Sequence, residues 1–559
     1  MKRKVGDLHA FLHPSSLIPH PFVEAPMRIR SLRVKRDPLA TASFVAFAVC
    51  LVLALGSGAV AVAGDKTRSQ AERALRDGEF ELAEKLFREV LTKDAHDNQA
   101  RLGLSYTLFK MRRLRDAYDH AARVVANDPL SPRAHALLGS VVLASGDFRM
   151  SVEEFRTALS LDDSDALAIA GLAMVDFYEN RLTASLDGLR RAVAINSSEP
   201  DFIYSLAQAA ARAERYKEAA DAYERFLIIA PRTDADRRAR IRGLIDFLRY
   251  LGNQTDLYST SGASQTSIHF EIPNNRPIIE VRINGRREPL HFVLDTGSGI
   301  SVISEETAKR LGIRPVARGG MARAVGGKFE IVYGFLQSVE IGDAHVENVP
   351  VYIRRFYNDE IPVDGYIGLA VVTKYVTTVD YGSQTLSLRR NRQSADQIAS
   401  SPTAIEIPIR TTSSGFLSGE VQVEGINRPF NFIIDTGAST SVVSEKMMEI
   451  EEMSNFKHPT RMRVYGAAGI ADGVQTLVLP RVLLGAQARE NVDVAVLDLE
   501  PVNETTGFVQ SGIIGGNFLR HFRVTFDFKK SVIYLETLNA TASSIERASP
   551  ADAAETGRL

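Results

Sequence analysis

The chain has 559 residues, of which 45% are hydrophobic and 24% are charged. This length exceeds what one hydrophobic core supports, so several domains are expected. The formal net charge is -1, and residues 1–63 hold eight Lys or Arg against three Asp or Glu. The remainder therefore carries -6, which argues against nucleic acid as the main partner. The only cysteine, Cys50, excludes an intrachain disulfide and a cysteine-based metal site, and the histidines are scattered.

The N-terminal part of the sequence has the pattern of an export signal. Residues 1–41 form a basic region, and residues 42–64 are uncharged, largely apolar and end in small residues. This order is typical of a secretory signal peptide. The uncharged stretch also reaches the ~20 residues that a membrane helix needs. A cleaved signal and a retained inner-membrane anchor with a cytoplasmic N-terminus are both left open; either one predicts that the rest is periplasmic or secreted, which suits a bacterial protein.

Residues 66–250 repeat themselves at a period of 34 residues. One register holds small residues throughout: Ala83, Ala117, Ser151, Ser185 and Ala219. Another is mostly large: Phe87, Ala121, Phe155, Leu189 and Tyr223. Small residues let paired helices approach closely, and large ones fill the space between successive pairs. The pattern resembles the tetratricopeptide repeat, which implies an all-α solenoid with a concave face.

The turns of this repeat are less uniform than its helices. Gly78 and Gly146 suit the turn between paired helices. Arg112 and Asn180 occupy the same position of the repeat but depart from this glycine pattern. Two roles are left open for the solenoid. It either binds a peptide or protein partner, or it acts as a rigid spacer beside the next domain.

The remaining sequence has the alternation of β-strands, and it contains one unit twice. A polar segment at 251–267 is predicted to be a linker. The first copy then occupies 268–390 and the second 404–537, joined by a linker at 391–403. The Ala-, Ser- and Glu-rich segment 538–559 is predicted to be a disordered tail.

Each copy contains an apolar segment that ends in Asp-Thr-Gly. The first reads Phe-Val-Leu-Asp-Thr-Gly-Ser at 292–298, and the second reads Phe-Ile-Ile-Asp-Thr-Gly-Ala at 432–438. Further along, each copy has an apolar segment that ends in glycine, at 365–368 and 512–515. Two motifs with matched surroundings are not a chance occurrence. Both copies resemble the retropepsin-like aspartic proteases, which implies an all-β domain of two lobes.

The resemblance implies that Asp295 and Asp435 face each other as a catalytic pair that needs no cofactor. Two adjacent carboxyl groups share one proton, so that one activates a water molecule while the other polarises the substrate carbonyl. The predicted function is an exported aspartic endopeptidase acting on a protein or peptide. The alternatives are a strand-end turn role for each aspartate, a non-catalytic exported peptide-binding scaffold, and a homodimer whose lobes pair between chains.

Residues next to the two aspartates are implied to support them: Thr296, Gly297, Ser298, Thr436, Gly437 and Ala438. The threonines are expected to cross-link the two loops, and the Ser298 hydroxyl is expected to reach Asp295, for which Ala438 offers no counterpart. Two glycine-rich hairpins are predicted to act as flaps over the cleft, with turns marked by Gly326, Gly327, Gly466 and Gly469.

Overall fold

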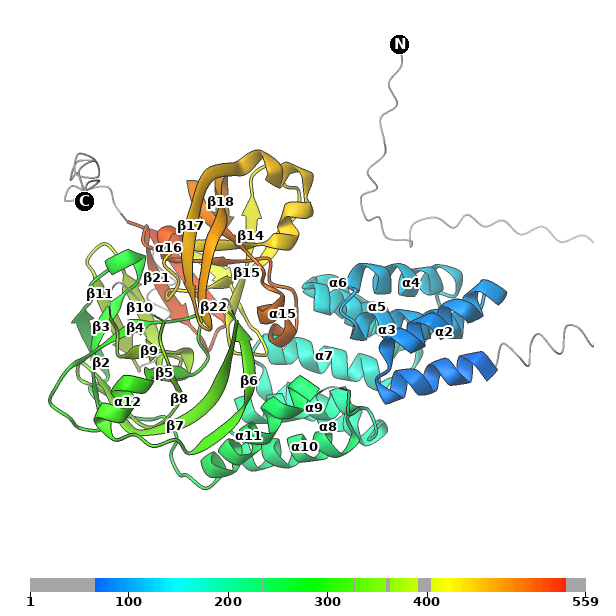
Figure 1. Ribbon diagram of the computed structural model, residues 1–559, viewed down its shortest axis with the longest axis horizontal. Coiled ribbons are helices and arrows are strands. Elements are labelled where there is room, and N and C mark those ends of the chain that lie inside the picture. Colours follow the sequence, from blue (N-terminus) through cyan, green and yellow to red (C-terminus); the bar gives the residue numbers. More distant parts are fainter. Residues whose placement is uncertain (1–65, 234, 325–326, 358–361, 391–403, 539–559) are drawn as a thin grey trace, which may run out of the picture. The chain divides into compact units, whose positions relative to one another are not determined.

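A computed structural model describes residues 66–538, apart from 234, 325–326, 358–361 and 391–403 (Figure 1). The predicted basic region 1–41, the signal or anchor 42–64, the linker 391–403 and all of the tail beyond residue 538 lie outside these residues. Within the part of the chain that the structure describes, no helix is long and apolar enough to cross a membrane. The described residues divide into two compact units, with the boundary between Ala134 and His135.

Helices occupy the chain from residue 66 to residue 252, as the repeat predicts. After a first helix at 66–77 come α2 (Phe80–Lys93), α3 (Asn98–Lys110), α4 (Leu114–Asn127), α5 (Pro132–Ser145), α6 (Phe148–Leu161), α7 (Ala166–Tyr178), α8 (Leu182–Ile195), α9 (Pro200–Arg212), α10 (Tyr216–Ile229) and α11 (Ala235–Gly252). The first unit ends within α5, and the second unit contains the later helices and both β lobes.

The 34-residue period sets both the helix contacts and the turns. All five members of the small register are fully buried, and the Phe155 ring lies so close to Gly139 and Gly171 that a Cβ atom there would clash with it. The turn backbone is left-handed at every repeat: Gly78, Arg112, Gly146, Asn180 and Glu214 have φ between 59° and 91°. Arg112 and Asn180 therefore differ from glycine in residue type but adopt the same turn conformation.

Three sheets follow the helices. Lobe 1 contains β1 (Ser259–Gly262), β3 (Ile278–Ile283), β4 (Leu290–Leu294), β5 (Ser301–Ser304), β6 (Ala317–Ala324), β7 (Gly327–Ile341), β8 (Ala344–Arg354) and β9 (Gly365–Ile367), ordered β1-β8-β5-β9-β4-β3-β7-β6. Lobe 2 contains β13 (Arg410–Thr411), β14 (Leu417–Val423), β15 (Phe430–Ile434), β16 (Ser441–Ser444), β17 (Lys457–Gly466), β18 (Gly469–Leu484), β19 (Gln487–Leu497) and β20 (Gly512–Ile514), ordered β13-β14-β15-β20-β16-β19-β18-β17.

The third sheet joins the two lobes. Its strands are β2 (Gln265–His269), β10 (Val376–Asp380), β11 (Thr385–Arg389), β12 (Ile405–Pro408), β21 (Phe522–Asp527) and β22 (Val532–Thr537), ordered β12-β22-β21-β10-β11-β2. Strand β10 of the first copy pairs with β21 of the second, with Val379 opposite Val524. The two copies therefore associate within one chain. The predicted fold class is confirmed: a helical-repeat region precedes an all-β domain of two lobes.

The short helices of the β domain lie between these strands. They are α12 (Glu305–Leu311) and α13 (Leu369–Val372) in lobe 1 and α15 (Glu500–Thr506) and α16 (Gly516–Leu519) in lobe 2, with 3-10 turns at Pro273–Asn275, Glu445–Glu449 and Glu451–Phe456. The segment predicted as a linker, 251–267, contains β1 and the first residues of β2. These Ser- and Thr-rich strands lie at sheet edges, where polar side chains face water and give no apolar strand signal.

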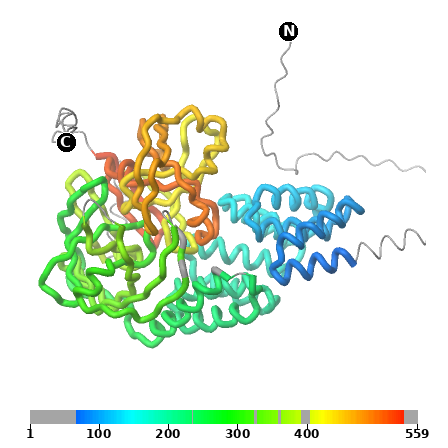
Figure 2. Tube along the Cα trace, in the orientation of Figure 1, coloured from blue at the N-terminus to red at the C-terminus, as the bar shows by residue number. Residues whose placement is uncertain are grey.

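In the second unit the helices pack against both lobes, and Figure 2 shows α11 running beside the strands of lobe 1. On lobe 2, Phe508 makes edge contacts with Phe148 and Tyr178, at centroid distances of 4.9 and 5.0 Å. On lobe 1, Phe247 of α11 stacks on Tyr333 of β7 at 4.3 Å. These are aromatic contacts of the kind that stabilise a protein core.

Arg212, at the end of α9, anchors the helices to lobe 2 by hydrogen bonds to backbone carbonyls. Its guanidinium donates to the carbonyl oxygens of Phe177 and Thr411, each at 3.2 Å, and to that of Thr412. It also lies over the Phe177 ring, 3.7 Å from the centroid. Because one guanidinium bridges α7 and lobe 2, its charge-assisted hydrogen bonds add to the backbone bonds that these carbonyls already accept.

Replacing Arg212 by Met is therefore expected to lower the free energy of unfolding by roughly 2–4 kcal/mol, because several charge-assisted hydrogen bonds between the repeats and lobe 2 are lost together. Urea unfolding followed by far-UV circular dichroism measures the change. Arg215, an exposed residue paired with Glu218, provides the control, and its replacement by Met should cost about 0.5 kcal/mol. Equal losses for the two variants would show that Arg212 is not an anchor.

Candidate active site

The two Asp-Thr-Gly motifs occupy equivalent places in the two lobes. Asp295 directly follows β4, which pairs in parallel with β9, and Asp435 directly follows β15, which pairs in parallel with β20. The Asp295 amide donates to the Ile367 carbonyl at 3.0 Å, and the Asp435 amide donates to the Ile514 carbonyl at 2.9 Å. The apolar glycine-containing segments noted in the sequence thus form the strands that hold each aspartate loop.

The loops are tied together by the two threonines. The Thr296 hydroxyl donates to the Ile434 carbonyl at 2.8 Å, and the Thr436 hydroxyl donates to the Leu294 carbonyl at 2.6 Å. Each hydroxyl also accepts a hydrogen bond from the other threonine: the Thr436 N–H donates to the Thr296 hydroxyl at 3.0 Å, and the Thr296 N–H donates to the Thr436 hydroxyl at 3.1 Å. Both side chains are almost fully buried, so four hydrogen bonds shielded from water fix one lobe against the other.

The carboxyl groups of Asp295 and Asp435 face each other closely enough for each to shift the pKa of the other. Glycine makes this approach possible. A Cβ atom on Gly297 would lie 2.3 Å from Cγ of Asp435, and one on Gly437 would lie 2.7 Å from Oδ1 of Asp295. Any larger residue at either position would displace the facing carboxyl group.

The two carboxyl groups have different hydrogen-bond partners. Asp435 accepts from the backbone N–H of Gly437 at 2.7 Å and of Ala438 at 3.1 Å, whereas Asp295 accepts from that of Gly297 at 2.9 Å. The expected bond from the Ser298 hydroxyl to Asp295 is not the one formed, because this hydroxyl donates to the Ile300 carbonyl at 2.7 Å. The asymmetry of the pair therefore comes from the backbone.

Burial and mutual repulsion shift the titration of this pair. Burial raises the pKa of Asp295 well above its usual value, and the neighbouring Asp435 carboxyl raises it further. Burial also raises the pKa of Asp435, while the backbone donors of Gly437 and Ala438 oppose that shift. Since hydrogen bonds to a carboxylate favour its ionised form, Asp435 is better placed to carry the charge and Asp295 to keep the proton.

Both predicted flap segments form β-hairpins. Strands β6 and β7 enclose one turn, in which Gly326 lies outside the described residues and Gly327 has a φ of 134°. Strands β17 and β18 enclose the other, with Gly466 paired to Gly469. A Cβ atom on Gly327 would lie 3.9 Å from the carbonyl oxygen of Ala468, so the tips of the two hairpins lie close together.

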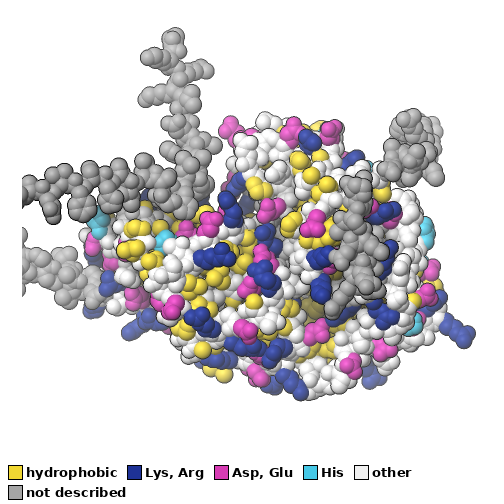
Figure 3. Space-filling model, turned by 180° about the vertical axis from the view of Figure 1, so that it is seen from behind, with side chains coloured by type: hydrophobic (Ala, Val, Ile, Leu, Met, Phe, Trp, Pro, Cys, Tyr) yellow, Lys and Arg dark blue, Asp and Glu magenta, His cyan; other side chains and the backbone are white. Residues whose placement is uncertain are grey.

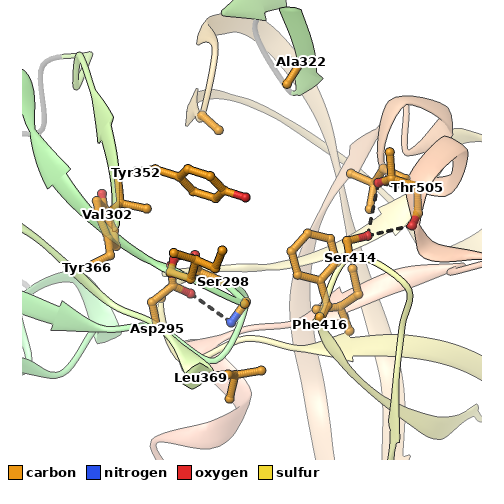
Figure 4. Close-up of a pocket in the computed structure, with 18 of the residues that line it drawn as sticks. Asp295, Ser298, Val302, Ala322, Tyr352, Tyr366, Leu369, Ser414, Phe416 and Thr505 are labelled. Carbon is orange, nitrogen blue, oxygen red and sulfur yellow. Dashed lines mark hydrogen bonds between the residues drawn. The ribbon is translucent and has the colours of Figure 1, made fainter. Parts of the chain in front are cut away.

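A cavity of about 1540 Å³ lies between the lobes, the hairpins and the repeat helices α9 to α11. Asp295 and Asp435 are in its lining. Figure 4 shows Tyr352 and Tyr366 of lobe 1 facing Ser414, Phe416 and Thr505 of lobe 2 across the cavity. Tyr366 lies in the glycine-ended segment 365–368, but the other four belong to no motif, and alternation along β8 could have assigned Tyr352 to one strand face but not to a cleft. Among the described residues, no cluster of His, Cys, Asp and Glu could hold a metal ion.

Comparisons with known proteins agree with this geometry. The family model "Aspartyl protease" matches residues 279–371 and 419–518, and two tetratricopeptide-repeat models match 74–141 and 170–233. No curated protein matches the chain.

Two solved structures are similar to parts of the chain. An aspartic proteinase from Irpex lacteus is 12% identical and covers 50% of this chain and 99% of its own, with a TM-score of 0.35. A tetratricopeptide-repeat protein of Thermus thermophilus is 20% identical and covers 33% of this chain and 98% of its own, with a TM-score of 0.29. At these values neither structure bears on what this chain does.

Two β lobes that each present one Asp-Thr-Gly loop to a shared cavity define the class of the aspartic peptidases. The C-terminal part of this chain is an aspartyl protease domain, and tetratricopeptide repeats precede it.

Replacing Thr436 by Val removes two of the four threonine hydrogen bonds. It leaves the Leu294 carbonyl and the Thr296 amide buried without a partner, which is expected to cost roughly 2–4 kcal/mol of stability. Thr436→Ser keeps the hydroxyl and should cost about 1 kcal/mol or less. Chemical denaturation measures both, and equal losses for Val and Ser would rule out the hydroxyl as the cause.

Replacing Asp295 by Asn should stabilise the folded protein at neutral pH. The pKa of Asp295 is higher in the folded protein than in the unfolded chain. Between about pH 4, where the unfolded carboxyl group ionises, and the raised pKa of the folded state, the folded state therefore binds more protons than the unfolded state. The carboxyl group thus lowers the stability of the folded protein as pH rises through this range. The gain from Asn is expected to be near zero at about pH 3 and on the order of 1–3 kcal/mol at about pH 7. Melting temperatures across this range, with exposed Asp343→Asn as control, test the sign; a gain that shrinks with rising pH would contradict it.

Proposed function

We propose that this protein is an exported aspartic endopeptidase that hydrolyses peptide bonds with a water molecule held between Asp295 and Asp435. The observation that supports the proposal most directly is the close approach of these two carboxyl groups in the lining of a large cavity. A turn role at a strand end requires neither this contact nor the buried threonine bonds that fix it.

In the proposed reaction the ionised Asp435 removes a proton from the water molecule, whose oxygen attacks the carbonyl carbon of the substrate. Asp295 gives its proton to the carbonyl oxygen. The attack and this proton transfer together give a neutral tetrahedral intermediate with two hydroxyl groups. Asp435 then passes the proton that it gained to the amide nitrogen while Asp295 recovers its own from the hydroxyl group, and the C–N bond breaks. The two carboxyl groups carry every proton in these steps.

The cavity suits a peptide in an extended conformation. It runs from the carboxyl pair to the two hairpins, whose tips lie close together above it. Opening of the hairpins would admit the chain, and their closure would exclude bulk water from the reacting groups. Both carboxyl groups come from one chain, so the proposed site needs no second copy.

The repeats are proposed to hold part of the substrate or a protein partner. Tyr204, Tyr223 and Arg237, on α9, α10 and α11, line the same cavity as the two aspartates. Export is proposed from the basic and apolar pattern of residues 1–64. An exported chain without a disulfide depends on its core and on the lobe–repeat contacts for stability.

Replacing either Asp295 or Asp435 by Asn is expected to reduce cleavage of a mixed peptide pool by about 10²–10⁴-fold. Wild-type activity should follow a bell-shaped pH profile, falling on the acid side as Asp435 gains a proton. It falls on the alkaline side as Asp295 loses its proton, above the ordinary range of a carboxyl group.

Mass spectrometry of the digested pool provides the measurement, and Asp343→Asn, outside the cavity, provides the control. Cleavage that survives in both active-site variants would eliminate the mechanism. A wild type that binds peptides from the pool and cuts none of them would favour a peptide-binding scaffold instead.

A further inference from the structure

The cavity contains a guanidinium group that the proposed mechanism does not use. Arg354, the last residue of β8, lines the cavity beside the carboxyl pair. Its Nε atom is inaccessible to water and has no hydrogen-bond partner among the described residues. Burial lowers the pKa of Arg354. A buried N–H donor without an acceptor is costly, so the Arg354 Nε offers a hydrogen bond that a ligand in the cavity could accept.

The strand pattern of β8 explains why this side chain enters the cavity. Val351 and Ile353 are buried in the core of lobe 1, and the alternating Tyr352 and Arg354 are less buried and line the cavity, which Ile353 also touches. Strand β5 runs parallel to this segment, with Ser304 opposite Arg354. The guanidinium is therefore held on a central sheet strand, and regular strands position a recognition group more firmly than a loop does.

Aromatic side chains surround the guanidinium. The Phe329 ring, from the hairpin strand β7, lies under it with the ring centroid 5.0 Å from the guanidinium carbon. Tyr366 of β9 lines the same part of the cavity, and in Figure 4 it lies beside Val302 on the lobe 1 side. A pocket with apolar walls and a guanidinium within it fits a side chain that has a short aliphatic stem and a terminal carboxylate.

The charges of the cavity point in the same direction. Besides the aspartate pair, its lining holds eight cationic side chains and three anionic ones: Arg212, Arg237, Arg240, Arg276, Arg354, Lys374, Arg463 and Lys529 against Glu214, Glu330 and Glu504. Several of these cations form ion pairs; Lys374, for example, lies 2.8 Å from a carboxylate oxygen of Glu214. The Nε atom of Arg354 has no hydrogen-bond partner among the described residues. By contrast, the outer face in Figure 3 intersperses Lys and Arg with Asp and Glu.

We infer that Arg354 forms an acid-recognising subsite, so that this protein prefers peptides with Glu or Asp close to the cleaved bond. The inference rests on the proposed peptidase function and adds the chemical class of its substrate. A substrate carboxylate would supply a charged acceptor for the Nε–H and could accept a second hydrogen bond from the same guanidinium. A neutral Gln at the same position offers one acceptor oxygen and no charge, so its hydrogen bond to the guanidinium would be weaker than that of Glu.

The test uses the full chain and a peptide library in which each position around the cleaved bond carries either Glu or Gln. Wild type is expected to cleave the Glu form at one position at least about tenfold faster than the Gln form. Arg354→Met should bring the Glu/Gln rate ratio close to one. Arg354→Lys should give an intermediate ratio, because lysine keeps the positive charge but cannot donate two parallel N–H bonds to one carboxylate. Arg282→Met, an exposed change on β3 outside the cavity, should leave the ratio unchanged.

Each outcome decides for or against the inference. Equal wild-type rates for Glu and Gln at every position overturn it while leaving the peptidase proposal intact. A Glu preference that persists in Arg354→Met overturns the assignment to this residue. A variant that shifts only the pH profile would make Arg354 an electrostatic partner of Asp295, which also overturns the subsite.

A second measurement keeps the inference testable where catalysis or folding fails. If wild type cuts no peptide, the peptidase proposal fails, and fluorescence anisotropy with a labelled Glu/Gln peptide pair decides the subsite by itself. Tighter binding of the Glu peptide by wild type but not by Arg354→Met supports the subsite, and equal binding overturns it. Arg354→Gln, which keeps hydrogen-bonding capacity and similar volume, replaces the Met variant if that variant does not fold by circular dichroism.

Discussion

The four hydrogen bonds between Thr296 and Thr436 and the opposite loops are the constraint on which the rest of the site depends. They are buried, reciprocal and related by the approximate symmetry of the two lobes. Each threonine holds the loop of the other lobe, so neither aspartate can move without the other. Two carboxyl groups that repel each other when ionised can stay in contact only in a frame of this rigidity.

Within this symmetric frame the two aspartates differ in their backbone hydrogen-bond donors. The four threonine bonds are nearly equivalent, yet Asp435 accepts from two backbone donors and Asp295 accepts from one. A small difference in the backbone of two loops thus distinguishes two chemically identical side chains. The Ser298 hydroxyl takes no part in this difference, because it closes its own loop on the Ile300 carbonyl.

The repeat helices of the second unit pack directly against the β domain and are not merely joined to it by a linker. In the second unit they contact lobe 2 through Arg212 and Phe148 and lobe 1 through Phe247, so they span both halves of the β domain. Gly243 of α11 and Gly319 of β6 meet so closely that a Cβ atom on Gly243 would lie 2.0 Å from the Gly319 Cα. One strand of the lobe 1 hairpin therefore packs directly on a repeat helix.

The sequence alone determined the features that repeat along the chain. The 34-residue period predicted the helices, and two Asp-Thr-Gly segments in matched strands predicted two lobes with Asp295 and Asp435 at equivalent places. Such features are local, because spacing and apolar alternation are written into neighbouring residues. Only the tertiary structure decided where the Ser298 hydroxyl points, that α11 packs on β6, and that Arg354 enters the cavity. Those outcomes depend on contacts between residues far apart in the chain, and no local pattern of residue types encodes which distant group a side chain meets.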